Sequence, residues 1–336
     1  MKNNLFYILS IFSFIIPVKF LIKLTGIRII YPFYHIVNDN QPPHIKHLYS
    51  ARTIKQFRKD LDFLRRYFHN TKDVLKNSND KQNYFHLSFD DGLSECYDVI
   101  APILKEYNIK ATFFINSGFV DNKDLFFKYK ASIIVEEIKQ KGLTENQKTK
   151  ISTVLLSKRL LNINQIIRYI LNITYFQKQK LDKIADILEI SFYDYLQKHK
   201  PYISSHQIKE LIKDGHQIGS HSIDHPLFSN LSEKEQIRQT SESIQYTENE
   251  FDVKAKLFAF PFTDDQVKTS FFNTVFNNKI IDYSFGTAGI KKDSITKNIQ
   301  RIPIEKKSMS AERYIKTEYL LYFLKRLIQK NRINRK

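Results

Sequence analysis

Short apolar runs alternate along the chain with stretches whose apolar residues recur every three to four positions. Residues 28–37 are rich in β-branched and aromatic side chains and predict a first buried strand. Helical spacing predicts a helix over 53–67 with Thr53 as its N-cap, and a second helix over 97–106. Further strands are predicted at 85–89, 111–115, 217–220, 257–260, 282–285 and 300–304. Strands that alternate with helices in this way indicate parallel β/α units.

Residues 123–205 depart from this alternation. Apolar residues such as Ile134, Ile138, Ile166 and Ile170 recur there at helical spacing, and strand-like runs are scarce. The segment therefore predicts a helical insertion between two strands.

The two ends of the chain carry different signals. Residues 5–18 hold no charge, but the run is short for a membrane span of about 20 residues, and no small-residue cleavage site follows it. We expect an apolar helix within 1–27 that either packs on the domain or lies on a membrane. Residues 311–329 predict a basic amphipathic helix, and 331–336 form a basic tail. These features favour a cytoplasmic or membrane-peripheral protein over a secreted one.

The composition is strongly basic, with a formal net charge of +18. Such a balance favours an anionic partner, although the same excess is compatible with lysines spread over solvated faces. Nucleic acid is not expected, because no helix concentrates Arg and Lys beside base-reading residues. Cys96 is the only cysteine, which excludes an intrachain disulfide and a cysteine-based zinc site.

Two adjacent carboxylates, Asp90 and Asp91, follow the strand predicted at 85–89. Catalytic groups of parallel β/α folds gather at the C-terminal ends of strands. One carboxylate can bind a metal while its neighbour accepts a proton from water. Alone, the pair is equally compatible with a turn that caps a helix.

Two histidines, His221 and His225, follow the strand predicted at 217–220. Imidazoles four residues apart can face one ion if the segment is a helical turn. Two histidines and a carboxylate are a frequent ligand set of catalytic zinc, and the same set accepts cobalt, manganese or iron. Polar loop residues are the alternative interpretation.

Together, the two segments resemble the polysaccharide deacetylase family, also called the NodB homology domain or carbohydrate esterase family 4. Residues 88–92 match its Thr/Ser-Phe-Asp-Asp-Gly motif, and residues 221–225 match its His-Ser/Thr-x-x-His motif. The resemblance covers about 32–304. It implies an α/β fold, a distorted (β/α) barrel with fewer than eight strands, as a catalytic domain over 28–330. We expect the insertion at 123–205 to pack beside the barrel mouth.

The same resemblance implies roles for individual residues. Asp91, His221 and His225 would hold a divalent metal, with zinc as the expected ion, and Asp90 would be the general base. The implied reaction is removal of acetyl groups, chiefly N-acetyl, from a carbohydrate such as a polysaccharide or a surface-glycan precursor. An anionic or lipid-linked substrate, or a membrane surface, would suit the basic charge.

The chain departs from the family pattern in two places. The third motif usually reads Arg-x-Pro-Pro-Tyr, but residues 258–262 lack both the arginine and the tyrosine. The Phe262 N–H can still serve an oxyanion hole. The usual late histidine, the general acid, is also missing, and Arg301 stands in its region. We expect His35 to be the acid, unless it is an ordinary buried histidine, and Arg301 to fix Asp90 or hold an anionic substrate group.

Two other functions stay open at this point. Loss of the late acid is compatible with a metal-binding but inactive homologue that recognises glycans. An amidase or esterase acting on a non-carbohydrate substrate is the other, because fold does not fix substrate. Asp264 and Asp265 follow the third motif, and we expect them in a solvated loop.

Overall fold

The computed structural model of the chain describes residues 2–71, 81–156, 160–305 and 309–335. Its centre is a parallel sheet in which the strand order is β11-β9-β8-β7-β6-β5-β2-β12. In that order the strands span Asn298–Gln300, Tyr283–Gly286, Leu257–Ala259, Gln217–Ser220, Ala111–Ile115, Leu87–Phe89, Pro32–Tyr34 and Ile302–Pro303. The strands alternate with helices along the chain, so the predicted α/β class is confirmed.

The sheet closes into a barrel because its two ends belong to one interrupted strand. β11 pairs with β9, β12 pairs with β2, and only Arg301 separates β11 from β12. The backbone changes partner at this point: the N–H of Arg301 donates to Gly286, and the N–H of Ile302 donates to Tyr31. The predicted distorted (β/α) barrel is therefore confirmed, although the strand expected at 300–304 is broken in two.

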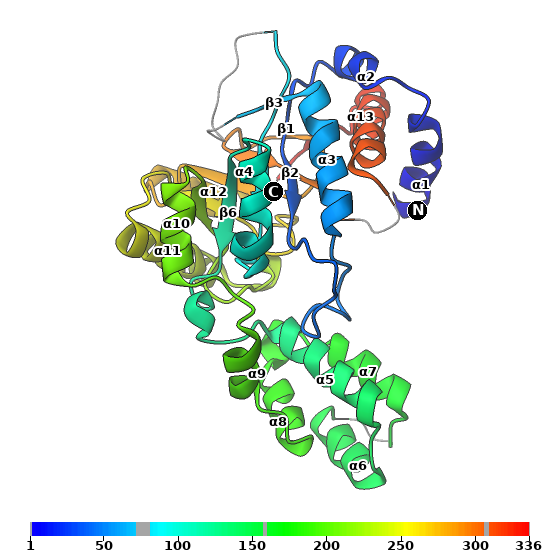
Figure 1. The fold of residues 1–336 in the computed structure, drawn as a ribbon, viewed down its shortest axis with the longest axis vertical. Coiled ribbons are helices and arrows are strands. Elements are labelled where there is room, and N and C mark those ends of the chain that lie inside the picture. The colour runs from blue at the N-terminus through cyan, green and yellow to red at the C-terminus, as the bar shows by residue number, and fades with distance from the viewer. Residues whose placement is uncertain (1, 72–80, 157–159, 306–308, 336) are drawn as a thin grey trace.

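Helices surround the barrel (Figure 1). They are α3 (Ile54–Tyr67), α4 (Ala101–Glu106), α10 (Ser205–Lys213), α11 (Glu233–Phe251), α12 (Thr269–Asn277) and α13 (Ala311–Leu327). α3 confirms the helix expected at 53–67: Thr53 accepts a hydrogen bond from the Gln56 N–H at 3.2 Å and completes a capping box. Its inner face buries Phe57, Leu61 and Leu64 in the main core.

The strand expected at 28–37 forms two short strands. β1 (Ile29–Ile30) joins a small parallel sheet with β4 (Tyr84–Phe85) and β3 (His69–Asn70), whereas β2 belongs to the barrel. The first strand region therefore bridges the two sheets.

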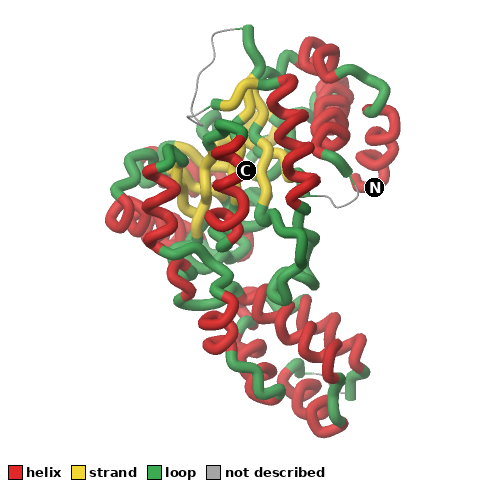
Figure 2. The backbone as a smooth tube through the Cα atoms, in the orientation of Figure 1, coloured by secondary structure: helices red, strands yellow, loops and turns green. Residues whose placement is uncertain are grey.

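Between β6 and β7 the chain forms a lobe of five helices within the described residues. They are α5 (Phe127–Lys141), α6 (Glu145–Val154), α7 (Ile163–Leu171), α8 (Gln179–Ile187) and α9 (Phe192–His199). The lobe extends from the barrel along the long axis of the molecule (Figure 1), and Figure 2 shows no strand in it. Ile134, Ile138, Ile166 and Ile170 are buried in its own apolar core.

The N-terminal apolar segment is two helices rather than the single helix that we expected. α1 (Lys2–Ser13) and α2 (Val18–Thr25) are separated at Pro17, whose ring removes a backbone donor. Both pack against α13 (Figure 1). No helix within the described residues combines the length and the apolar character that crossing a bilayer requires.

The expected basic tail is folded back onto the barrel. β13 (Arg332–Ile333) pairs with β10 (Lys292–Asp293), and the side chain of Arg335 is only 3% exposed. Arg335 binds the carboxylates of Asp264 and Asp293. A free cationic tail is therefore wrong for Arg335, because its charge is neutralised inside the fold.

Candidate active site

The ends of neighbouring strands bring the predicted ligands to one edge of the barrel. Asp90 and Asp91 follow β5 directly, and His221 follows β7. β6 lies between these strands, and the pairing is parallel, so their C-terminal ends meet. Ile115 at the end of β6 accepts a hydrogen bond from the His221 N–H at 2.8 Å. This bond fixes the point at which the histidine loop leaves the sheet.

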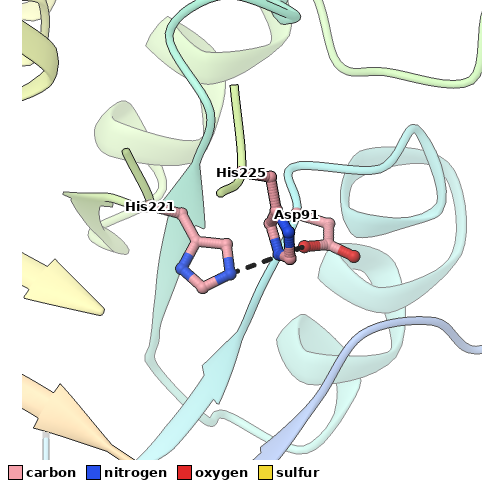
Figure 3. Close-up of side chains that lie close together, drawn as sticks. All are labelled: Asp91, His221 and His225. Carbon is pink, nitrogen blue, oxygen red and sulfur yellow. Dashed lines mark ion pairs between the residues drawn. The ribbon is translucent and has the colours of Figure 1, made fainter. Parts of the chain in front are cut away.

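Asp91, His221 and His225, here called the ligand cluster, are buried, and their candidate ligand atoms all lie within 4.8 Å of one another. Asp91 Oδ1 lies 3.1 Å from His225 Nε2 and 3.5 Å from His221 Nε2. Figure 3 shows the two imidazoles directed at this carboxylate. Separations of this size are compatible with ligand bonds of about 2.0–2.2 Å to one ion.

The segment that carries both histidines is a loop and not the helical turn that their spacing suggested. Ser222 and His225 have φ angles of 70° and 62°, which a right-handed helix excludes. Gln239 of α11 accepts a hydrogen bond from the Ile223 N–H at 3.0 Å, and Ser222 Oγ accepts one from the His225 N–H at 3.1 Å. Two left-handed residues, rather than helical periodicity, therefore turn both rings to one side.

In the ligand cluster, two hydrogen-bond acceptors face each other: Nε2 of His221 and Oδ1 of Asp91. His221 Nδ1 donates to the carbonyl of Ala259 at 2.8 Å, so Nε2 carries the lone pair. Burial lowers the pKa of His221 to about 4, which keeps the ring neutral at physiological pH. Asp91 Oδ1 is buried and has no hydrogen-bond partner among the described residues. A divalent cation between these atoms would satisfy both, so the residues fit a metal.

The second oxygen of Asp91 is held by two tyrosines. Tyr129 donates to Asp91 Oδ2 at 2.8 Å, and Tyr49 lies 3.4 Å from the same atom. Burial and the nearby Asp91 carboxylate raise the pKa of both tyrosines well above the usual value, so both hydroxyls keep their protons. Such contacts orient a ligating carboxylate. Neither tyrosine could be identified from the sequence, because no motif surrounds it.

Arg301 donates hydrogen bonds to both carboxylate oxygens of Asp90. Its Nη1 donates to Oδ1 at 2.7 Å and its Nη2 to Oδ2 at 2.8 Å, and Nη1 also donates to Ser88 at 3.0 Å. Burial opposes ionisation of Asp90, but Arg301 outweighs it and holds the pKa of Asp90 below its usual value. Of the two roles expected for Arg301, the structure has the contact with Asp90.

His35 lies at the end of β2 with its ring against a carboxylate. Its Nδ1 is 2.6 Å from Glu305 Oε2, and the other oxygen of Glu305 accepts a hydrogen bond from the Ile36 N–H at 2.9 Å. Burial lowers the pKa of His35, but Glu305 outweighs burial and raises it to about 10. The imidazole is therefore protonated at neutral pH. Its side chain is 28% exposed, so it is not an ordinary buried histidine.

Phe262 lies against one member of the ligand cluster, His225. Its φ angle is 58°, a left-handed conformation that strains a residue other than glycine. No acceptor for its N–H occurs among the described residues. Its ring meets that of His225 nearly edge-on, with centroids 4.7 Å apart. Phe262 thus combines a ring contact with His225 and a backbone donor that has no partner among the described residues.

A cavity of about 470 Å³ lies at this site, which is a typical size for a small-molecule site. The lining residues are His35, His47, Leu48, Tyr49, Asp91, Phe126, Lys128, Leu171, His225 and Phe262. The segment 123–205 supplies Phe126, Lys128 and Leu171, so the helical lobe forms one wall. Asp90, His221 and Arg301 are not among the lining residues.

The sequence profile of a family described as polysaccharide deacetylase matches residues 77–274, which is more than half of the chain. The chain belongs to the polysaccharide deacetylase family.

Solved members of the deacetylase group have the same fold. IcaB from Ammonifex degensii is 16% identical, with a TM-score of 0.54, over 87% of this chain and 98% of that chain. The deacetylase PplD of Streptococcus pyogenes, solved with acetate, is 15% identical, with a TM-score of 0.53, over 86% and 97%. At these identities the likeness concerns the fold alone.

A curated sequence relative is the uncharacterized protein YlxY of Bacillus subtilis strain 168. It is 35% identical over 89 aligned residues, with coverage of 20% of this chain and 27% of that protein. The chain thus spans about a quarter of the length of this relative, and the match carries no activity.

This member of the polysaccharide deacetylase family lacks two groups of the family pattern, and other side chains lie near the site. Residues 258–262 lack the arginine of the third motif, and Arg301 pairs with Asp90 from the interrupted strand. No histidine follows the second motif, and His35 occupies the cavity with Glu305 behind it. Sequence reasoning missed Glu305, which lies 270 positions from its partner.

A second buried polar cluster anchors the loop that carries Phe262. Asp264 is 2% exposed, so the solvated loop that we expected is wrong at this position. Its Oδ2 accepts hydrogen bonds from Asn298 at 2.8 Å and Gln300 at 2.6 Å, and it also pairs with Arg335. These donors satisfy the carboxylate and draw the loop inward.

Proposed function

We propose that this protein is a metal-dependent hydrolase that removes acetyl groups, chiefly N-acetyl groups, from a carbohydrate such as a polysaccharide or a surface-glycan precursor. Family membership supports a carbohydrate deacetylase. The observation that carries the proposal is that one cavity is lined by Asp91 and His225 of the ligand cluster and by His35, whose ring contacts Glu305. The net charge of +18 supports an anionic glycan as the substrate.

The groups around the cavity divide the chemistry among them. A divalent cation held by the ligand cluster, with zinc as the first candidate, would supply Lewis-acid chemistry that polarises an acetyl carbonyl and acidifies water. Asp90 accepts the proton of the attacking water, and Arg301 keeps this carboxylate charged and oriented. The Phe262 N–H donates to the oxygen of the tetrahedral intermediate, where negative charge develops.

The carbon–nitrogen bond then breaks, and the acetyl group leaves as acetate. His35 donates its proton to the departing amine nitrogen, while Glu305 holds the ring in place. This acid supports an enzyme over an inactive glycan-binding homologue, because the case for the homologue depended on the missing late histidine.

Two variants test the assignment. We expect Asp90→Asn to keep its metal and to lose about 10²–10⁴-fold in acetate release from N-acetylated glycans. We expect His221→Ala to lose the metal as well, since it removes a ligand. Tyr193→Phe, on the exposed side of α9, is a matched control that should retain both properties. Metal content is measured by elemental analysis of each purified protein.

Equal metal loss in Asp90→Asn and His221→Ala would mean that the carboxylates are assigned wrongly. A metal-loaded wild type that binds N-acetylated glycans without releasing acetate would instead favour the inactive homologue.

A further inference from the structure

The N-terminal helices present an apolar surface to the outside of the molecule. Eight large apolar side chains of α1, the turn after it and α2 are between 48% and 81% exposed. We call them the outer face: Leu5, Tyr7, Ile8, Ile11, Phe12, Phe14, Ile15 and Phe20. Within α1, Leu5, Ile8 and Phe12 follow one another at spacings of three and four residues, so they are neighbours on one side of the helix. A folded chain seldom leaves so many large apolar groups together in water.

The opposite side of α1 is firmly packed on the domain through both apolar and polar side chains. Ser13 Oγ lies 3.0 Å from Thr317 Oγ1, and Arg313 Nε donates to the carbonyl of Ser10 at 2.8 Å. Lys316 donates to the carbonyl of Phe14 at 2.9 Å. Phe6 and Leu9 are also buried on this side, and the ring of Phe6 lies 4.8 Å from that of Tyr314 in α13, so α1 carries apolar side chains on both of its sides. These contacts fix the helix on α13 and leave the outer face exposed on its other side.

We propose that the outer face docks on an anionic lipid bilayer, with α1 lying along the membrane surface. The first 38 residues contain Lys2, Lys19, Lys23 and Arg28 and no Asp or Glu. Lys19 and Lys23 are exposed on α2, next to the outer face. Apolar side chains in the headgroup region, bordered by cations that meet anionic lipids, are the pattern of an interfacial helix.

The length of α1 and the net charge of the chain favour a bilayer surface over the other partners that could cover the outer face. A helix of 12 residues is about 18 Å long and cannot cross a hydrocarbon core of about 30 Å, so it lies in the interface. A second copy of this chain would bring another net charge of +18 against the same cationic border, which opposes self-association. An anionic bilayer satisfies both the apolar face and the lysines.

Flotation of the full chain with vesicles tests the proposal. We expect wild type to float with vesicles of phosphatidylcholine and phosphatidylglycerol at low salt. The triple variant Ile11→Gln, Phe14→Gln, Ile15→Gln should bind the vesicles at least about tenfold more weakly than wild type. It removes apolar contacts and leaves the charge unchanged. The double variant Lys19→Gln, Lys23→Gln should weaken binding by about fivefold per lysine.

The control replaces three exposed apolar residues of the helical lobe, Leu160→Gln, Phe176→Gln and Tyr193→Gln, and should float like wild type. Thermal unfolding and acetate release establish that each variant is folded. Wild type that remains in the soluble fraction, a triple variant that floats like wild type, or equal loss in the control overturns the proposal. Wild type that is dimeric without lipid and becomes monomeric in the triple variant also overturns it, because the face would then bind protein.

Discussion

Arg335→Met is expected to lower the free energy of unfolding by about 3 kcal/mol at neutral pH, because two buried carboxylates lose their cationic partner. The guanidinium donates to Asp293 Oδ2 at 2.6 Å and to the carbonyl of Asp264 at 2.7 Å, and it pairs with the Asp264 carboxylate. Removing one partner of a buried ion pair costs about 3–5 kcal/mol. The lower end applies here, because Asn298 and Gln300 still donate to both carboxylates.

The pH dependence of this deficit follows from Asp264. Burial raises the pKa of Asp264, but Arg335 and the amides of Gln300 and Asn298 outweigh burial and hold it below its usual value. A carboxyl with a lowered folded-state pKa stabilises the fold above its unfolded pKa of about 3.9, and that contribution is lost as pH falls through the folded value. Without Arg335, burial dominates, and Asp264 takes up a proton at a higher pH. The deficit is therefore largest near neutral pH and shrinks as pH falls toward about 4.

Urea unfolding at neutral pH and near pH 4.5 measures both quantities. Arg332→Met is the matched control, because Arg332 is an exposed basic residue on the same strand, β13. Its effect should stay within about 0.5 kcal/mol. A deficit in Arg335→Met no larger than that of the control, or one that grows on acidification, would refute the reasoning.

Three further substitutions test the proposed site. Arg301→Lys keeps a positive charge but not the two-pronged contact with Asp90, so acetate release should fall about 10²-fold with metal content unchanged; unchanged turnover would argue against this positioning role. His35→Asn should lower kcat by about 10²–10⁴-fold without metal loss, and near-normal turnover would exclude His35 as the acid. Tyr129→Phe removes a hydrogen bond to Asp91 and should weaken zinc affinity about 10–100-fold in a chelator competition, whereas unchanged affinity would show that the hydroxyl does not orient the ligand.

The sequence predicted those parts of the site that follow directly from strand ends. Asp91 and His221 each lie within two residues of the end of a short predicted strand, and parallel strands bring such positions together at one edge. The barrel was predictable for the same reason, because strand and helix patterns alternate along the chain. Local periodicity also located α3 and its cap at Thr53.

Contacts between distant segments could not be predicted in this way. Glu305 and Tyr129 reach the site from far along the chain, and nothing local distinguishes them from other polar residues. The charge of Arg335 predicted a solvated tail. Composition does not reveal that Arg335 pairs with two buried carboxylates, Asp264 and Asp293. The loop between His221 and His225 was missed for a different reason: a spacing of four fits a helical turn, and only the φ angles distinguish the two.

Arg301 lies between β11 and β12 and places a positive charge beside Asp90. The residues of the third motif, 258–262, supply no such charge. Arg301 lies where the backbone changes its pairing partner, with its N–H on the carbonyl of Gly286 at 3.2 Å. Its guanidinium lies 4.3 Å from the ring centroid of Phe33 and 5.2 Å from that of Phe114, among side chains of β2 and β6 that flank β5. From this position it reaches Asp90, 211 positions earlier in the chain. In the proposed mechanism Asp90 is the base, and this ion pair gives it a cationic partner although residues 258–262 lack the arginine of the third motif.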